Sequence, residues 1–212
     1  ITGSGTLNME DMGVTQSTRT NNPSSLYIED TTINVNLPST KCGQWEGNCK
    51  LAGSAKVTYT GCGNYSVLKL GQGNGITHTL TLKDNASLYC VQDDASVASP
   101  YPVSGLECFQ GATITLQDNA YLEAEGRATS GDHSGCGVLA DGDILVQDNA
   151  TLKATAYAEA ISTWGRLTVN GGKLIVKSEN GNGVYSDAAI DISNNATVEA
   201  TGYYPALFGN TG

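Results

Sequence analysis

Three aspartates, Asp84, Asp118 and Asp148, stand in nearly identical contexts, each followed by Asn-Ala. If the segments that carry them stack as neighbouring strands, their carboxylates lie about 4.8 Å apart and repel one another. A calcium ion, which takes carboxylate and carbonyl oxygens, would relieve this repulsion, so these aspartates are a candidate metal site. In the alternative interpretation each carboxylate accepts backbone N–H groups at its own turn, because Asn194 and Gly171 occupy the same place elsewhere.

Aromatic side chains form a second candidate site, because an exposed aromatic face stacks on the flat face of a sugar ring. At one position of a repeated segment the chain carries, in order, Phe109, Leu139, Ser162, Tyr185 and Phe208. Trp164 lies nearby in the same segment. The aromatic members of this set are predicted to bind carbohydrate. The alternative is that a loop at 91–107 or 126–136, or a neighbouring domain, covers them.

The segments that position these residues are repeats. Residues 80–90, 114–124, 144–154 and 190–200 read almost alike, and 167–176 is the same unit with one residue deleted in its turn. Weaker copies begin at residues 1, 28 and 51. The apolar residue before each turn is Ile1, Ile28, Leu51, Leu82, Leu116, Val146, Val169 or Ile192. Their spacings of 27, 23, 31, 34, 30, 23 and 23 residues indicate a fixed repeat of 23 with insertions in some turns.

Each unit alternates apolar and polar residues, which is typical of a strand with one buried face. A third short strand follows at 137–142, 160–165, 183–188 and 206–209, and its inward residues are predicted to be Cys108, Val138, Ile161 and Val184. Three strands and three bends per repeat predict an all-β fold, a right-handed parallel β-helix of about eight rungs. Stacked rungs then share one core, with small inward residues at Cys90, Ala124, Ala154 and Ala200.

The Asp-Asn turn has a structural role in this fold. Asn and Asp tolerate left-handed backbone and form hydrogen bonds within the turn. The asparagines that follow the turn position on successive rungs are predicted to stack as a ladder: Asn85, Asn119, Asn149 and Asn195.

The composition limits the function classes. Only 15% of the residues are charged, 26 are glycine, and the net charge is −10, which argues against a nucleic-acid partner. No apolar run approaches the roughly 20 residues of a membrane span. The six cysteines form no CxxC pair, and a disulfide between Cys42 and Cys49 is as compatible with the sequence as free thiols. We expect residues 1–212 to be a single domain of a longer protein, since Ile1 is not a natural start and the repeat has no caps.

The units at 114–126, ITLQDNAYLEAEG, and 167–186, LTVNGGKLIVKSENGNGVYS, resemble the rungs of bacterial cell-surface β-helix proteins. Among these is a clostridial carbohydrate-binding domain family whose fold is similar to that of pectate lyases. The resemblance is clearest over residues 76–212. It implies an extracellular protein on a bacterial surface that binds plant or host polysaccharide, in some cases with calcium. It implies no particular site residues.

The same fold also includes polysaccharide lyases, in which carboxylates hold calcium and an arginine abstracts a proton from a uronate. Arg166 resembles that arrangement, because Asp141, Asp143, Asp187 and Asp191 flank it on neighbouring rungs. An arginine with a pKa above about 12 is a poor base, however, and a cross-rung ion pair with Asp143 is the simpler interpretation.

Three functions follow from these observations. The first, which we favour, is a secreted or cell-surface, adhesin-like module that binds a polysaccharide or cell-surface glycan without catalysis. The second is a structural or adhesive stalk that binds a protein partner. The third is a calcium-dependent polysaccharide lyase.

Overall fold

The computed structural model describes residues 1–10, 25–38, 42–61, 65–71, 78–93, 103–129 and 135–210. Over these ranges the chain forms 22 strands and no helix, and the strands make three parallel sheets, here named A, B and C. With no helix among the described residues, no helical segment there is long and apolar enough to span a bilayer.

Sheet A contains seven strands in the order of the sequence. They are β2 (Ser25–Glu29), β5 (Asn48–Ala52), β8 (Thr79–Leu82), β11 (Thr113–Leu116), β14 (Ile144–Gln147), β17 (Leu167–Asn170) and β20 (Ile190–Ser193).

Sheet B contains eight strands, also in sequence order. They are β1 (Thr6–Glu10), β3 (Thr32–Leu37), β6 (Lys56–Gly61), β9 (Ser87–Gln92), β12 (Tyr121–Gly126), β15 (Thr151–Ala156), β18 (Lys173–Ser178) and β21 (Thr197–Thr201).

Sheet C contains the third strand of each rung. Its members are β4 (Gly43–Trp45), β7 (Leu68–Leu70), β10 (Ser104–Cys108), β13 (Cys136–Ala140), β16 (Ile161–Thr163), β19 (Val184–Ser186) and β22 (Leu207–Gly209).

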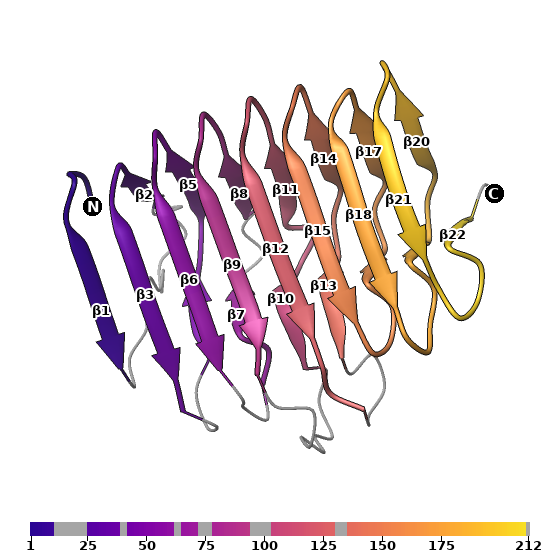
Figure 1. Ribbon diagram of the computed structural model, residues 1–212, viewed down its shortest axis with the longest axis horizontal. Coiled ribbons are helices and arrows are strands. Elements are labelled where there is room, and N and C mark those ends of the chain that lie inside the picture. Colours follow the sequence, from indigo (N-terminus) through magenta and orange to yellow (C-terminus); the bar gives the residue numbers. More distant parts are fainter. Residues whose placement is uncertain are drawn as a thin grey trace.

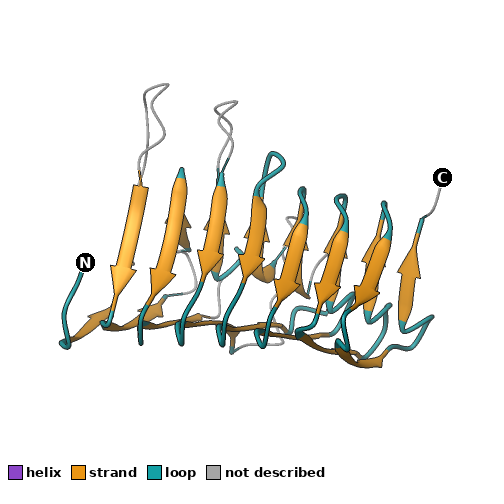
Figure 2. Cartoon of the chain, turned by 90° about the horizontal axis from the view of Figure 1, so that it is seen from above, coloured by secondary structure: helices purple, strands orange, loops and turns teal. Residues whose placement is uncertain are grey.

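The three sheets wind into one solenoid. In Figure 1 the chain runs down the front sheet, B, and up sheet A behind it while it advances from left to right, which makes the coil right-handed. Figure 2 shows the same rungs side by side along the axis. Each rung contributes one strand to each sheet, and β1 lies before the first complete rung. The predicted parallel β-helix is therefore confirmed.

The register of sheet A is the one that the repeat predicts. Successive pairing joins the apolar residues before the turns: Ile28, Leu51, Leu82, Leu116, Val146, Val169 and Ile192. Leu82, Leu116, Val146 and Val169 are fully buried. Ile192 is in register but 46% exposed, because within the described residues no rung packs on the far side of β20.

The core changes in residue size along the axis. Cys90, Ala124 and Ala154 are buried at the predicted inward position of sheet B, and Ala200 is partly buried. The same position on β6 is Tyr59, which is also fully buried and meets Trp45 edge to face at 5.9 Å between ring centroids. Room for this pair comes from Gly43, since a Cβ there would lie 2.5 Å from the Tyr59 ring.

One predicted register in sheet C is wrong. Leu106, not Cys108, pairs with Val138, so the outward residue of β10 beside Leu139 is Glu107 rather than Phe109. The two positions differ by two residues and therefore share the same inward or outward phase. Alternation alone could not separate them.

The cysteines that the structure describes are free thiols, so the Cys42–Cys49 disulfide does not form. Cys49 points into the core from β5, and burial raises the pKa of its thiol to about 12. Cys62 lies outside the described residues. The buried cysteines act as small apolar side chains in the stack.

The turns from sheet A to sheet B stack on one another, and three of the four predicted asparagines form a ladder of hydrogen bonds. Asn119 Nδ2 donates to Asn85 Oδ1 at 3.3 Å, and Asn149 Nδ2 donates to Asn119 Oδ1 at 3.5 Å. Asn195 is separated from Asn149 by the shorter turn of β17, where Gly172 precedes Lys173. The ladder is therefore confirmed over three rungs, from Asn85 to Asn149, and the turn with Gly171 and Gly172 separates Asn195 from it.

Candidate functional site

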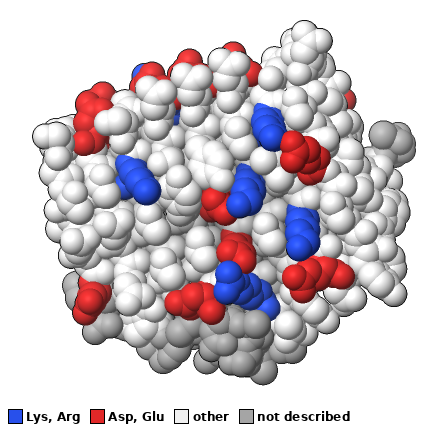
Figure 3. Space-filling model, viewed as in Figure 1, with Lys and Arg blue, Asp and Glu red and all other residues white. Residues whose placement is uncertain are grey.

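Asp84, Asp118 and Asp148 lie in successive turns and all adopt left-handed backbone, with φ of 60°, 58° and 59°. Their Oδ2 atoms accept N–H groups across the rungs: Asp84 from Gly53 at 3.0 Å, Asp118 from Asp84 at 3.0 Å, and Asp148 from Asp118 at 3.1 Å. The expected N–H bonds exist, but each donor lies in the turn of the preceding rung rather than in the aspartate's own turn. Figure 3 shows the resulting row of acidic side chains along the upper edge of the molecule.

These turns do not fit a calcium site. Calcium requires several oxygens directed at one point, whereas here an N–H donor occupies one oxygen of each carboxylate. Lys83 Nζ also lies 3.1 Å from Asp84 Oδ2. Over the ranges that the structure covers, no group of three or more His, Cys, Asp or Glu side chains is placed to hold a metal ion. We therefore assign the aspartates a structural role.

The outward column of sheet C is covered in the middle and open toward the C-terminal rungs. Leu139 and Ser162 are buried, although they point away from the core. Tyr185 is half-buried and Phe208 is 42% exposed. The outward side chains are thus covered in the middle of the column, whereas the aromatic side chains at its C-terminal end are accessible.

Tyr185 and Phe208 stack on each other. Their ring centroids are 5.3 Å apart and their planes differ by 9°. The rungs are only about 4.8 Å apart, which is too narrow for two rings to lie side by side in one plane. Phe208 therefore covers one face of Tyr185, and the opposite face is directed toward the rung of Ser162.

A groove of about 250 Å³ lies beside this second face. It is lined by Glu159, Ser162, Thr163, Trp164, Tyr185 and Asp187. The short Ser162 side chain leaves this space in the column, where the neighbouring rungs carry Leu139 and Tyr185. Pockets for drug-sized ligands span about 300–1,000 Å³, so the groove has the size for a single ring of a larger chain.

Trp164 forms the rim of the groove. It follows β16 directly, is 46% exposed, and its backbone N–H donates to Ala140 O at 3.0 Å. Thr163 also lines the groove, and its hydroxyl forms two hydrogen bonds within the protein: it donates to Gly142 O and accepts the N–H of Gly165. The sequence candidates Trp164, Tyr185 and Phe208 are thus brought together.

Phe109 lies in another environment. Its ring is 5.3 Å from Lys69 Nζ, and the ring of Tyr65 is 5.6 Å from the same ammonium. Lys69 Nζ in turn lies 3.2 Å from Glu107 Oε2. Phe109 therefore covers a buried ion pair and is not part of the groove.

The carboxylates around Arg166 have separate partners. Arg166 pairs with Asp191, while Asp143 accepts the backbone N–H of Arg166 at 2.8 Å. Asp141 accepts the N–H of Gln110 at 2.6 Å, and Asp187 accepts the hydroxyl of Tyr185 at 2.8 Å. The expected ion pair with Asp143 is thus replaced by one with Asp191. The lyase arrangement of carboxylates around a shared cation is not assembled.

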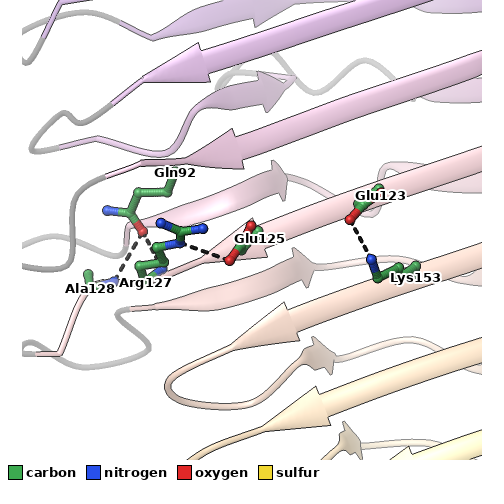
Figure 4. Close-up of polar contacts among 6 residues, drawn as sticks. All are labelled: Gln92, Glu123, Glu125, Arg127, Ala128 and Lys153. Atoms are coloured by element: carbon green, nitrogen blue, oxygen red, sulfur yellow. Dashed lines mark hydrogen bonds and ion pairs between the residues drawn. The ribbon is translucent and has the colours of Figure 1, made fainter.

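A second groove, of about 300 Å³, lies at the end of β12 and β15, next to the contacts drawn in Figure 4. There Gln92 Oε1 accepts the N–H groups of Arg127 and Ala128, at 2.7 and 3.1 Å, and fixes the chain after β12. Arg127 Nε lies 2.8 Å from Glu125 Oε1. Two charged residues of this second groove, Glu125 and Arg127, thus pair with each other, and Tyr157 is the single aromatic residue among the described residues that line it.

Glu159 and Thr163 are the groove residues that the sequence did not single out. Thr163 belongs to β16, whereas Glu159 does not belong to a strand. Glu159 lies in the bend between β15 and β16, outside the alternating pattern of any strand. One feature of the sequence could have pointed to Glu159. Its rung has the minimum length of 23 residues, so the bend that carries it is short and lies close to β16. From the sequence, Asp187 is named only as one of the carboxylates that flank Arg166 in the lyase interpretation.

No family model, no curated protein and no solved structure matches this chain. The site is therefore interpreted from its own geometry.

Proposed function

We propose that this protein is a non-catalytic, cell-surface module that binds a polysaccharide or surface glycan in the groove between Trp164 and Tyr185. The observation that carries the proposal is the gap at Ser162, which leaves one face of an aromatic ring bordering a space of about 250 Å³. A sugar ring offers a flat apolar face to such a ring and hydroxyl groups to the carboxylates beside it.

The arrangement favours binding over catalysis. None of the described residues that line the groove is a histidine or cysteine. The Thr163 hydroxyl is already bonded to Gly142 O and to the N–H of Gly165, and Asp187 already accepts the hydroxyl of Tyr185. Glu159 and Asp187 provide hydrogen-bond acceptors for a glycan. The extracellular location rests on the resemblance to surface β-helix proteins described above.

Trp164→Ala tests the proposal. Since aromatic stacking is worth about 0.5–1.5 kcal/mol, we expect affinity for a bound glycan to fall about 2- to 10-fold. Binding is measured on a glycan array, with and without calcium, followed by calorimetry on the glycans that bind. The melting temperature should stay close to that of the parent, because Trp164 is half exposed.

Tyr27→Ala is the matched control. Tyr27 is 37% exposed on β2, at the opposite end of the solenoid, and its removal should leave glycan binding unchanged. A folded parent that binds no glycan on the array would contradict the proposal, and so would equal binding by the parent and Trp164→Ala.

A further inference from the structure

Two carboxylates lie in the groove with the aromatic rings. Glu159 comes from the bend before β16, and Asp187 follows β19. The hydroxyl of Tyr185 donates to Asp187 Oδ1 at 2.8 Å. That hydrogen bond raises the pKa of Tyr185, and the charges of Asp187 and Glu159 act on the ring in the same direction. The negative charges of Asp187 and Glu159 are therefore both close to Tyr185, whose ring forms one wall of the groove.

No protein cation balances these charges within the groove. None of the described residues that line it is Lys, Arg or His. Arg166 follows Trp164 by two residues, but its guanidinium pairs with Asp191 at the start of the next rung. The chain as a whole has a net charge of −10. A bound group with a positive charge would thus be attracted, and one with a negative charge would be repelled.

From this charge pattern we infer that the groove selects amino sugars: glycans whose sugar ring carries a protonated amine are bound in preference to uncharged glycans, and uronate glycans are rejected. The inference rests on the proposed function, because it assigns a ligand class to the same groove. The ring stacks on the free face of Tyr185 while the ammonium group lies between Glu159 and Asp187. Repulsion of the wrong ligand supplies part of the specificity.

The test compares two oligosaccharides with the same sugar backbone, one with free amines and one with uncharged N-acetyl groups. A glucosamine tetramer with free amines and its fully N-acetylated counterpart are titrated by calorimetry at about pH 5.5, and only the amine form carries a positive charge. A galacturonate tetramer is the acidic ligand. We expect the amine form to bind about 5- to 10-fold more tightly than the acetylated form, since each partly exposed ion pair contributes a factor of about 2–5. The preference should shrink at high salt.

The double variant Glu159→Gln with Asp187→Asn removes both charges and keeps the hydrogen-bonding atoms. We expect the ratio of the two affinities to fall to about one. Glu199→Gln, which removes one charge on sheet B beside Lys173, is the control and should leave the ratio unchanged.

The outcomes separate the inference from the proposed function. Equal binding of both glucosamine forms, or preferred binding of the galacturonate tetramer, would overturn the inference and leave carbohydrate binding intact. A preference for the amine form that persists in the double variant would also overturn it. If no glycan binds the folded protein at all, the proposed function itself fails.

Discussion

Lys69 and Glu107 form an ion pair that is almost withdrawn from water, with side-chain exposures of 12% and 3%. Burial raises the pKa of Glu107, while the charge of Lys69 and the hydrogen bond from Ser66 oppose that shift. The aromatic rings of Tyr65 and Phe109 cover the ammonium group. The charge of Lys69 and the hydroxyl of Ser66 thus offset part of the desolvation of the Glu107 carboxyl.

Removing one partner leaves a buried charge unpaired. Lys69→Met should lower the free energy of unfolding by about 3–5 kcal/mol, and the added change Glu107→Gln should restore much of the loss. Urea denaturation of the two single variants and the double variant measures the coupling.

The pH dependence of Lys69→Met follows from the sign of the Glu107 shift. A carboxyl with a raised pKa stabilises the fold while it is protonated, so the stability of this variant should fall further as the pH rises through that pKa. Lys173→Met, which breaks the exposed pair with Glu199, is the control and should cost less than about 1 kcal/mol. Equal losses in both variants would contradict the structural role of the buried pair.

At the scale of the element, the turn between sheets A and B is stabilised by its charged residues. The N–H of Gly53 bonds to Asp84 and, with the smaller effect of Lys83, lowers the pKa of that carboxyl. A lowered pKa means that the carboxylate stabilises the fold above its unfolded pKa of about 3.9 and loses this effect as the pH falls through the folded value.

Asp84→Asn therefore should make the stability less dependent on pH. Asparagine tolerates the same left-handed backbone and offers an amide oxygen to Gly53, but it does not titrate. We expect melting temperatures between about pH 5 and pH 2 to fall less steeply than in the parent. Parallel curves for the variant and the parent would show that this turn does not contribute to acid sensitivity.

The sequence predicts the register of a strand well when the strand lies next to the Asp-Asn turn, and poorly when it lies farther along the chain. The register of sheet A follows from the sequence because the Asp-Asn turn marks the same point at Leu82, Leu116 and Val146. The register of β10 does not, since an insertion separates it from the preceding turn and Glu107 and Phe109 share the same phase.

The groove was predictable only in part. Its aromatic residues have a recognisable type and spacing. The space between them depends on a short side chain at Ser162 and on the stacking of Tyr185 against Phe208, which is a matter of ring orientation. Neither the covering of Leu139 nor the position of Glu159 is encoded in the alternation of a single strand.

At the scale of the whole molecule, the rungs share one continuous core. Val146 is fully buried between Leu116 and Val169 and contacts the middle of that core. A carboxylate at this position would be buried without a partner, which costs several kcal/mol.

Val146→Asp should therefore unfold the rungs around it, and amide hydrogen exchange should reveal the loss of protection first in β11, β14 and β17. Leu145→Asp is the matched control, because Leu145 points outward between Thr115 and Thr168 and should cost about 1 kcal/mol or less. A melting temperature of Val146→Asp within a few degrees of the parent would show that the residue is not needed for the core.

The two ends of the chain lie at opposite ends of the solenoid (Figure 1), and each rung pairs only with the rung before and after it. Tension between the ends would peel the ladders open one rung at a time instead of shearing them together. Each step would release 23 residues, as between Ile28 and Leu51, or up to 34, as between Leu82 and Leu116. These lengths correspond to roughly 80–120 Å of extended chain. In mechanical terms the solenoid is an extensible tether, which lengthens stepwise under a load while the remaining rungs stay folded.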